Sequence, residues 1–246
     1  MYQDKNDNCM TKPSSVTRVT KVNKMLDEKT TRLFERVKLA DDMVSAIEFN
    51  QTKKIKTIMS DKYFDVNTYS KKYNMSPIVY ACSKGNAKVV RMLLTCDGIN
   101  INYYDDYSST LLYDACKGGH IEVVKELLTY PNIDVNAGKC NCLPIHAAAG
   151  SNSVEIIKLL IAEPQFQVSA GFGDQETTPL MHAARKGQTQ AVEFLLFYYP
   201  LSYITKTCFN KSASDIARRE YEDDIADLID THIANQTQST QPASPV

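Results

Sequence analysis

The sequence predicts an all-α solenoid of about six helix-turn-helix units with protruding hairpin-like loops. Three observations lead to this fold class: an internal repeat, a pair of small residues at a fixed place in each copy, and an apolar stripe after that pair. The clearest copies start 33 to 35 residues apart, at Ser76, Thr110, Leu143, Thr178 and Ser212. A weaker copy starts at Asp42 and brings the number of units to six.

The first helix of each unit is expected at the start of its copy. Pro77, Pro144 and Pro179 take the second position of their copies, where a missing N–H costs a helix nothing. Helices approach closely where the facing side chains are small, which indicates a contact at Ala81-Cys82, Ala115-Cys116, Ala148-Ala149 and Ala183-Ala184. Residues that tolerate a left-handed backbone then end the helix, at Gly85, Gly119, Asn152 and Gly187.

The second helix of each unit carries apolar residues with the spacing of a buried helix face. Val89-Val90 and Leu93-Leu94 show this spacing, as do Val123-Val124 and Leu127-Leu128. Ile156-Ile157 with Leu159-Leu160 and Val192 with Leu195-Leu196 follow it too. Short polar segments close the units, namely Asp65-Val66-Asn67, Asn100-Ile101-Asn102, Asp134-Val135-Asn136 and Gln167-Val168-Ser169.

This pattern resembles the ankyrin repeat over most of the chain, from about Lys38 to Ile233. The best matches are Thr178-Pro179-Leu180-Met181-His182-Ala183-Ala184 and the segment from Gly119 to Leu128. One departure is that the opening Thr and the family's His three residues later never occur together here. The His position reads Val79, Tyr113, His146, Met181 and Asp215. The resemblance implies the fold and a protein-binding role, but not the exact geometry of the loops.

The repeat domain is expected to span residues 39–234, with units near 39–68, 69–102, 103–136, 137–170, 171–204 and 205–234. The first and last units carry many charges and are interpreted as caps. Residues 1–20 and 235–246 are polar and predicted to be disordered tails. Residues 21–38 have apolar residues near helical spacing, so they predict a helix that either covers the first unit or docks a partner.

Composition places the chain among ordinary globular proteins, with 43% hydrophobic residues and a formal net charge of −1. The seven cysteines are odd in number, and neither a secretory signal nor an apolar run of about 18 residues occurs. We therefore expect a reduced protein with no membrane span, in the cytoplasm and possibly also the nucleus. The near-neutral charge does not favour nucleic acid as a partner.

Protein binding is expected on a concave face, which the first helices and the loops before them would form. Aromatic residues in loops and charged residues at the ends of first helices are the candidates. The candidate partner-binding residues are Tyr73, Lys84, Tyr104, Asp106, Tyr107, Lys117, Lys139, Gln175, Arg185, Lys186 and Phe209. The alternative is that the aromatic rings pack against neighbouring loops and that the charges are only solvated.

Catalytic, metal and cofactor sites are not predicted. Cys140, Cys142 and His146 give three potential zinc ligands with one residue between the cysteines, whereas zinc sites favour four ligands and wider spacing. No phosphate-binding loop or paired catalytic motif occurs, so we expect neither an enzyme nor a small-molecule substrate. Asn136 resembles an asparagine that hydroxylases modify in some ankyrin repeats, but its simpler role is to close a turn.

The expected function is non-catalytic recognition of another protein, as an adaptor, scaffold, assembly factor or occluding inhibitor. The alternative is a targeting or substrate-receptor subunit, or a secreted effector, whose flanking segments recruit a second machine. Repeat faces share a fold and not a ligand, so the partner does not follow from the sequence.

Overall fold

The computed structural model describes residues 15–104, 110–138, 143–167, 177–205 and 210–239. Within these ranges the chain forms thirteen helices, and its one β-bridge joins Ser70 to Met75. The helices are α1 (Ser15–Glu48), α2 (Thr52–Met59), α3 (Pro77–Ser83), α4 (Ala87–Leu93), α5 (Leu111–Lys117), α6 (Ile121–Leu128), α7 (Pro144–Gly150), α8 (Val154–Ala162), α9 (Pro179–Arg185), α10 (Thr189–Tyr198), α11 (Leu201–Ile204), α12 (Ala213–Arg219) and α13 (Asp223–Ser239). The predicted all-α solenoid is confirmed.

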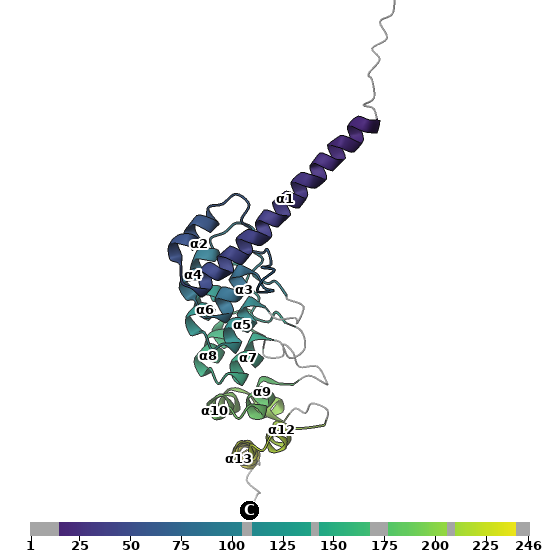
Figure 1. The fold of residues 1–246 in the computed structure, drawn as a ribbon. Coiled ribbons are helices and arrows are strands. Elements are labelled where there is room, and N and C mark those ends of the chain that lie inside the picture. Colours follow the sequence, from purple (N-terminus) through teal and green to yellow (C-terminus); the bar gives the residue numbers. More distant parts are fainter. Residues whose placement is uncertain (1–14, 105–109, 139–142, 168–176, 206–209, 240–246) are drawn as a thin grey trace, which may run out of the picture.

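The helices stack as six antiparallel pairs in two columns (Figure 1). One column holds the first helix of each pair, which is the C-terminal part of α1 followed by α3, α5, α7, α9 and α12. The other column holds α2, α4, α6, α8, α10 and α13, and the loops protrude beside the first column. The short α11 lies in the segment that joins the last two pairs.

The turn inside each pair places one residue in the left-handed region. The four positions predicted from the sequence have φ values of 70°, 68°, 57° and 69° at Gly85, Gly119, Asn152 and Gly187. The end units use Asn50, with φ 52°, and Tyr221, with φ 65°. Asparagine tolerates this conformation through its short polar side chain, whereas tyrosine is strained there.

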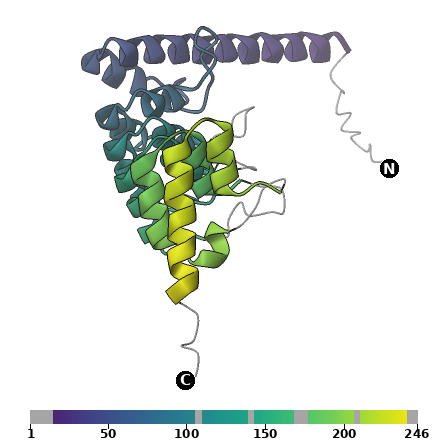
Figure 2. The same ribbon diagram turned by 90° about the horizontal axis from the view of Figure 1, so that it is seen from below.

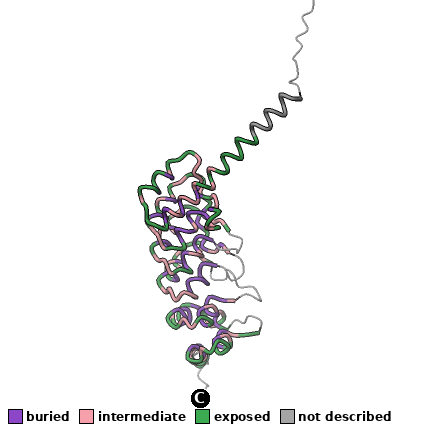
Figure 3. Tube along the Cα trace, in the orientation of Figure 1, coloured by how far each residue is buried: buried purple, intermediate pink, exposed green. Residues whose placement is uncertain are grey.

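The core runs along the stack between the two columns (Figure 3). The predicted small-residue pairs Ala81-Cys82, Ala115-Cys116, Ala148-Ala149 and Ala183-Ala184 are fully buried. The second helices bury their apolar faces against them, with no exposed surface at Val90, Leu93, Val124, Leu127, Ile157, Leu160, Val192 and Leu195. Each unit therefore completes the core of its neighbour, as a solenoid requires.

Two predicted boundaries at the N-terminal end were wrong. Helix α1 is continuous from Ser15 to Glu48, so residues 15–20 are helical rather than disordered, and residues 21–38 are not a separate helix. No Gly or Pro occurs between residues 15 and 48, so nothing in the backbone breaks the helix between the flank and the first unit. The predicted tail at residues 1–14 lies outside the described residues.

The C-terminal boundary differs in the same way. Helix α13 continues to Ser239, so residues 235–239 are helical and not part of a disordered tail. The segment between Asp223 and Ser239 also lacks Gly and Pro, and a side-chain contact of 2.9 Å joins Gln236 Nε2 to His232 Nε2 one turn earlier. Residues 240–246 lie outside the described part of the chain.

Candidate protein-binding surface

The bases of the loops are tied from unit to unit by asparagine side chains. Asn67 donates its amide to the carbonyl oxygen of Gly98 at 2.8 Å and accepts the N–H of Asn100 at 3.0 Å. The same two bonds join Asn102 to Asn132 and Asp134, and Asn136 to Gln165 and Gln167. Asn136 therefore closes its turn as predicted, and both polar atoms of its amide are engaged.

We call the free side of the first helices, together with the adjoining loops, the loop-side face (Figure 2). It corresponds to the face predicted to be concave. Lys84, Lys117, Arg185 and Lys186 all end first helices on this face and are exposed. The fourth unit has Gly150 and Ser151 at the equivalent positions. This gap divides the row of cations into two groups.

Tyr73 is held by contacts within the chain. Its hydroxyl donates to Glu48 Oε2 at 2.7 Å, and its ring lies 5.6 Å from the ring of Tyr80. Lys72 Nζ donates to the same hydroxyl at 2.9 Å and lies over the Tyr73 ring. The half-buried ring thus fixes its loop to the first unit, which is the packing role weighed as the alternative. Tyr104 is more open, with 40% of its surface exposed.

A cavity of about 280 Å³ opens between the loops of the second and third units. Tyr69 and Tyr103 form one wall, with their rings edge to face at 6.0 Å and a hydrogen bond of 2.9 Å between their hydroxyls. The other lining residues are Asn67, Ser76, Ile78, Val79, Asn100 and Leu111. The loop aromatics were a visible signal in the sequence, but the cavity depends on how two units stack and was not predicted.

Five predicted binding residues lie outside the described residues: Asp106, Tyr107, Lys139, Gln175 and Phe209. Lys84, Lys117, Arg185 and Lys186 are exposed at the ends of first helices, and Tyr104 is exposed in the loop before α5. Tyr73 lies in a packing contact.

The histidines that the structure describes in the middle of the stack have packing roles. His120 Nε2 donates a hydrogen bond of 3.0 Å to the Ser83 carbonyl oxygen, and a methyl group on Gly85 or Gly118 would collide with its ring. His146 is buried and bonds the Thr177 carbonyl at 2.8 Å. Its ring centre lies 5.1 Å from that of His182.

The buried thiols also pack rather than react. Cys82 and Cys116 have no exposed surface, and burial raises the pKa of both thiols well above the ordinary value. Among the described residues, no three His, Cys, Asp or Glu side chains are grouped as metal ligands. Cys140 and Cys142 lie outside those residues. None of the described helices has both the length and the apolarity to cross a bilayer.

The comparison with family models agrees with this architecture. Residues 43–139 and 134–207 match the model described as ankyrin repeats (3 copies), and together they cover well over half of the chain. A search of curated proteins gave no match. Ankyrin repeats are in general protein–protein interaction modules and are typically non-catalytic. The six stacked helix pairs, the left-handed turns and the family match together show that this chain belongs to the ankyrin-repeat family.

Proposed function

We propose that the loop-side face binds a partner protein and that the chain acts without catalysis, as an adaptor, scaffold, assembly factor or occluding inhibitor. The asparagine bridges carry this proposal. They hold the bases of three successive loops at hydrogen-bond distances of 2.7 to 3.0 Å. A surface that is ordered before binding loses little conformational entropy when the partner docks.

The chemistry of the face favours a partner segment with one apolar anchor and flanking acidic groups. The cavity beside Tyr69 and Tyr103 accepts an apolar side chain because Ile78, Val79 and Leu111 line it. Exposed ammonium and guanidinium groups at the ends of first helices supply the complementary charge. These cations are solvated and contribute more to encounter rate and specificity than to affinity.

The test is affinity purification with cross-linking mass spectrometry from cells that express the chain. One variant reverses three charges on the loop-side face: Lys84→Glu, Lys117→Glu and Arg185→Glu. A matched control reverses three exposed lysines on second helices: Lys53→Glu, Lys88→Glu and Lys158→Glu. A third variant, Val79→Lys, fills the cavity.

The partner is expected to be lost from the first and third variants and retained by the control, with unchanged helical circular dichroism in all three. Retention by the loop-side variants together with loss from the control would place recognition on the second helices and refute the proposal.

We also propose a cytoplasmic location. The thiols Cys82 and Cys116 are buried in the core, and unpaired cysteines of this kind suit a reducing compartment. Cell fractionation with thiol labelling tests it.

A second function, that of a targeting or substrate-receptor subunit, is favoured by one observation. Helix α1 extends beyond the repeats with Leu26, Leu33 and Phe34 more than half exposed. A subunit of this kind would hold one protein on the repeats and a second on the extension. Binding of two proteins at once, measured by sequential purification, separates this function from simple adaptor or inhibitor roles.

A further inference from the structure

One apolar stripe runs along α1 and passes from the core into solvent. Residues at the spacing of a helix face, Ala40, Val44 and Ile47, are at most 3% exposed against the repeats. The same face continues towards the N-terminus as Leu33, which is 61% exposed, and Leu26, which is 56% exposed. The stripe therefore keeps its apolar character where the first unit no longer covers it (Figure 3).

Two grooves lie along this uncovered stripe, one on each side of Leu33. The first, of about 410 Å³, is walled by Leu33, Phe34 and Val37. Lys38 and Lys71 stand at its edge. Phe34 is 69% exposed there.

The second groove, of about 390 Å³, is lined by Lys29, Arg32, Arg36 and Lys62 beside Leu33. Lys62 comes from the repeat domain, between α2 and the next loop, so this groove is shared between α1 and the first unit.

The charge around the grooves is positive. Of the four cations in the second groove, Arg36 pairs with Asp65 at 3.5 Å, and the described residues give the other three no ion pair. Asp41, which borders the first groove, already accepts hydrogen bonds from the Ser70 hydroxyl and the backbone of Lys72. Of the acidic residues in this part of α1, Glu28 and Glu35 lie on the side of the helix opposite Leu33, whereas Asp27 lies on the flank that carries Phe34, seven positions before it.

We propose that this surface binds an acidic amphipathic helix of a partner protein. The apolar stripe supplies the anchor line of a helix-in-groove contact, and the cations on its flanks complement acidic side chains. The proposal goes beyond the function of the loop-side face, because the two surfaces use different residues. A helix is the expected partner because the stripe continues, along the straight axis of α1, the same face with which α1 packs on the helices of the repeats. The partner would lie in the angle between α1 and the first loops (Figures 1 and 2). Lys71 lines the first groove and Lys62 the second.

Two other occupants are disfavoured by the same geometry. A second copy of α1 would bring Lys29, Arg32 and Arg36 close to the same three cations of the other copy, and like charges repel. A planar lipid surface would meet the repeat domain before it reached a stripe that faces the stack. Both remain outcomes that the experiment separates.

The experiment measures binding of the full chain to a labelled helical peptide of about 18 residues, by fluorescence anisotropy. The peptide carries leucine at alternating third and fourth positions and glutamate on the flanks. One control peptide has the same composition in a shuffled order, and another has lysine in place of glutamate. Vesicles of phosphatidylcholine with and without phosphatidylserine are tested by co-sedimentation, and self-association by analytical ultracentrifugation.

The acidic amphipathic peptide is expected to bind at least about tenfold more tightly than either control peptide. Leu33→Ala with Phe34→Ala weakens binding about tenfold or more, whereas Phe197→Ala, an 87% exposed aromatic on α10, leaves it unchanged. Lys29→Gln with Arg32→Gln weakens it about threefold at low salt and less at high salt. Circular dichroism verifies the fold of each variant.

Equal binding of the shuffled peptide, or insensitivity to the Leu33 and Phe34 changes, would overturn the proposal. Selective co-sedimentation with phosphatidylserine vesicles or a concentration-dependent dimer, either without peptide binding, would overturn it in favour of those occupants. The Lys84→Glu, Lys117→Glu and Arg185→Glu variant is expected to bind the peptide normally. Failure of the α1 proposal is therefore distinct from failure of the loop-side face.

Discussion

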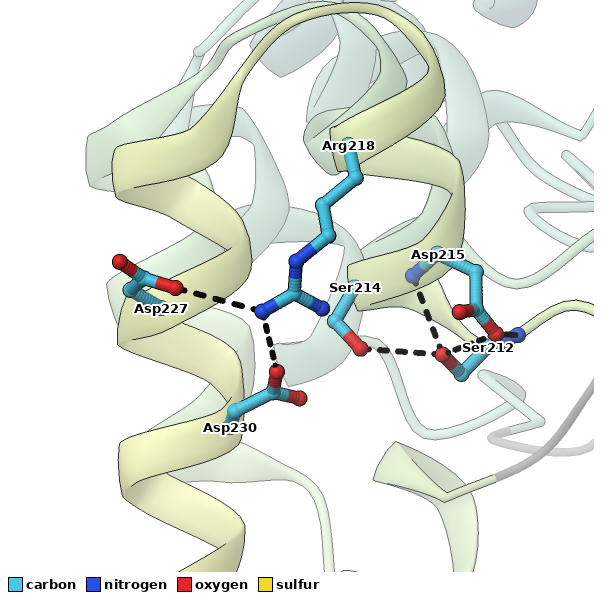
Figure 4. Close-up of polar contacts among 6 residues, drawn as sticks. All are labelled: Ser212, Ser214, Asp215, Arg218, Asp227 and Asp230. Atoms are coloured by element: carbon cyan, nitrogen blue, oxygen red, sulfur yellow. Dashed lines mark hydrogen bonds and ion pairs between the residues drawn. The ribbon is translucent and has the colours of Figure 1, made fainter.

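The two ends of the stack, where no further unit covers the outer surface, are built in different ways. At the C-terminal end, Arg218 of α12 bonds Asp227 at 3.2 Å and Asp230 at 2.7 Å on α13 (Figure 4). The Ser212 hydroxyl and the Asp215 carboxylate cap the start of α12 reciprocally. At the N-terminal end, α2 presents charged residues to solvent, but α1 continues past the repeats with an exposed apolar stripe.

This difference separates a cap from the extension that we propose as a binding element. A terminal unit needs a polar outer surface because no neighbour covers it. The last unit meets that need with exposed ion pairs between α12 and α13. The α1 extension places large apolar side chains in solvent, which a cap does not require. Such a contiguous exposed patch is typical of a binding site.

The largest expected effect divides α1 at the edge of the first unit. Ile47→Ala removes a side chain that is 3% exposed and is expected to lower the free energy of unfolding by about 2–4 kcal/mol. Leu33→Ala, on the same face but 61% exposed, is expected to change it by less than about 0.5 kcal/mol. Urea unfolding followed by circular dichroism measures both. Comparable losses in the two variants would mean that the extension is packed in solution and is not a free surface.

Acid is expected to weaken the fifth unit before either end. Burial, with the nearby charges of His146, Arg185 and Lys186, lowers the pKa of His182 to about 3. His182 thus stays neutral in the fold, whereas it takes up a proton in the unfolded chain below its ordinary value of 6.5. Stability is therefore full above pH 6.5 and falls with decreasing pH towards 3, by up to about 1.4 kcal/mol per pH unit.

The ends carry groups that titrate lower. Hydrogen bonds from Ser212 lower the pKa of Asp215, and for Asp41 the effect of burial, which raises the pKa, is outweighed by bonds from Ser70 and Lys72. Their contributions are present above the ordinary value of 3.8 and are lost only as the pH falls below it. Hydrogen exchange at pH 7 and pH 5 is expected to show faster opening of α9 and α10 than of α12. His182→Gln removes that difference, and its persistence in this variant would assign the effect elsewhere.

The sequence predicts the repeated part of the fold well because each unit repeats the same physical requirements. Small residues such as Ala115 are needed wherever first helices touch, and Gly119 is needed wherever the chain turns left-handed. The boundaries of α1 and α13 were mispredicted because they depend on the absence of a helix breaker, and polar composition suggested disorder instead.

The binding surface was less predictable than the fold. Exposed Lys84 and Lys117 follow from their positions at the ends of first helices. The packing of Tyr73 on Glu48 and Tyr80 joins two units, and so does the wall formed by Tyr69 and Tyr103. Such contacts depend on loop conformations that a repeat pattern does not specify.

A smaller effect compares the left-handed turns of the two end units. Tyr221 has φ 65° and is 91% exposed, so its side chain gains little packing in return for the strain. Tyr221→Gly is expected to stabilise the chain by about 0.5–1 kcal/mol, which is the strain less the added entropy of glycine in the unfolded chain. Asn50→Gly, at φ 52°, is expected to change stability by no more than about 0.3 kcal/mol. Thermal unfolding of both variants measures the contrast, and a loss of stability in Tyr221→Gly would reveal a contact made by the ring.

The smallest effect concerns the ion pairs that close the C-terminal end. Arg218 is exposed to solvent, as are Asp227 and Asp230, so water and salt screen their attraction. Arg218→Ala is expected to leave global unfolding almost unchanged and to speed hydrogen exchange only in α13. Raising the salt concentration should produce the same local effect in the unmodified chain and none in the variant. If Arg218→Ala instead unfolds the last unit together with α10, the closure of this end rests on the ion pairs rather than on the buried residues Ile225 and Ile229.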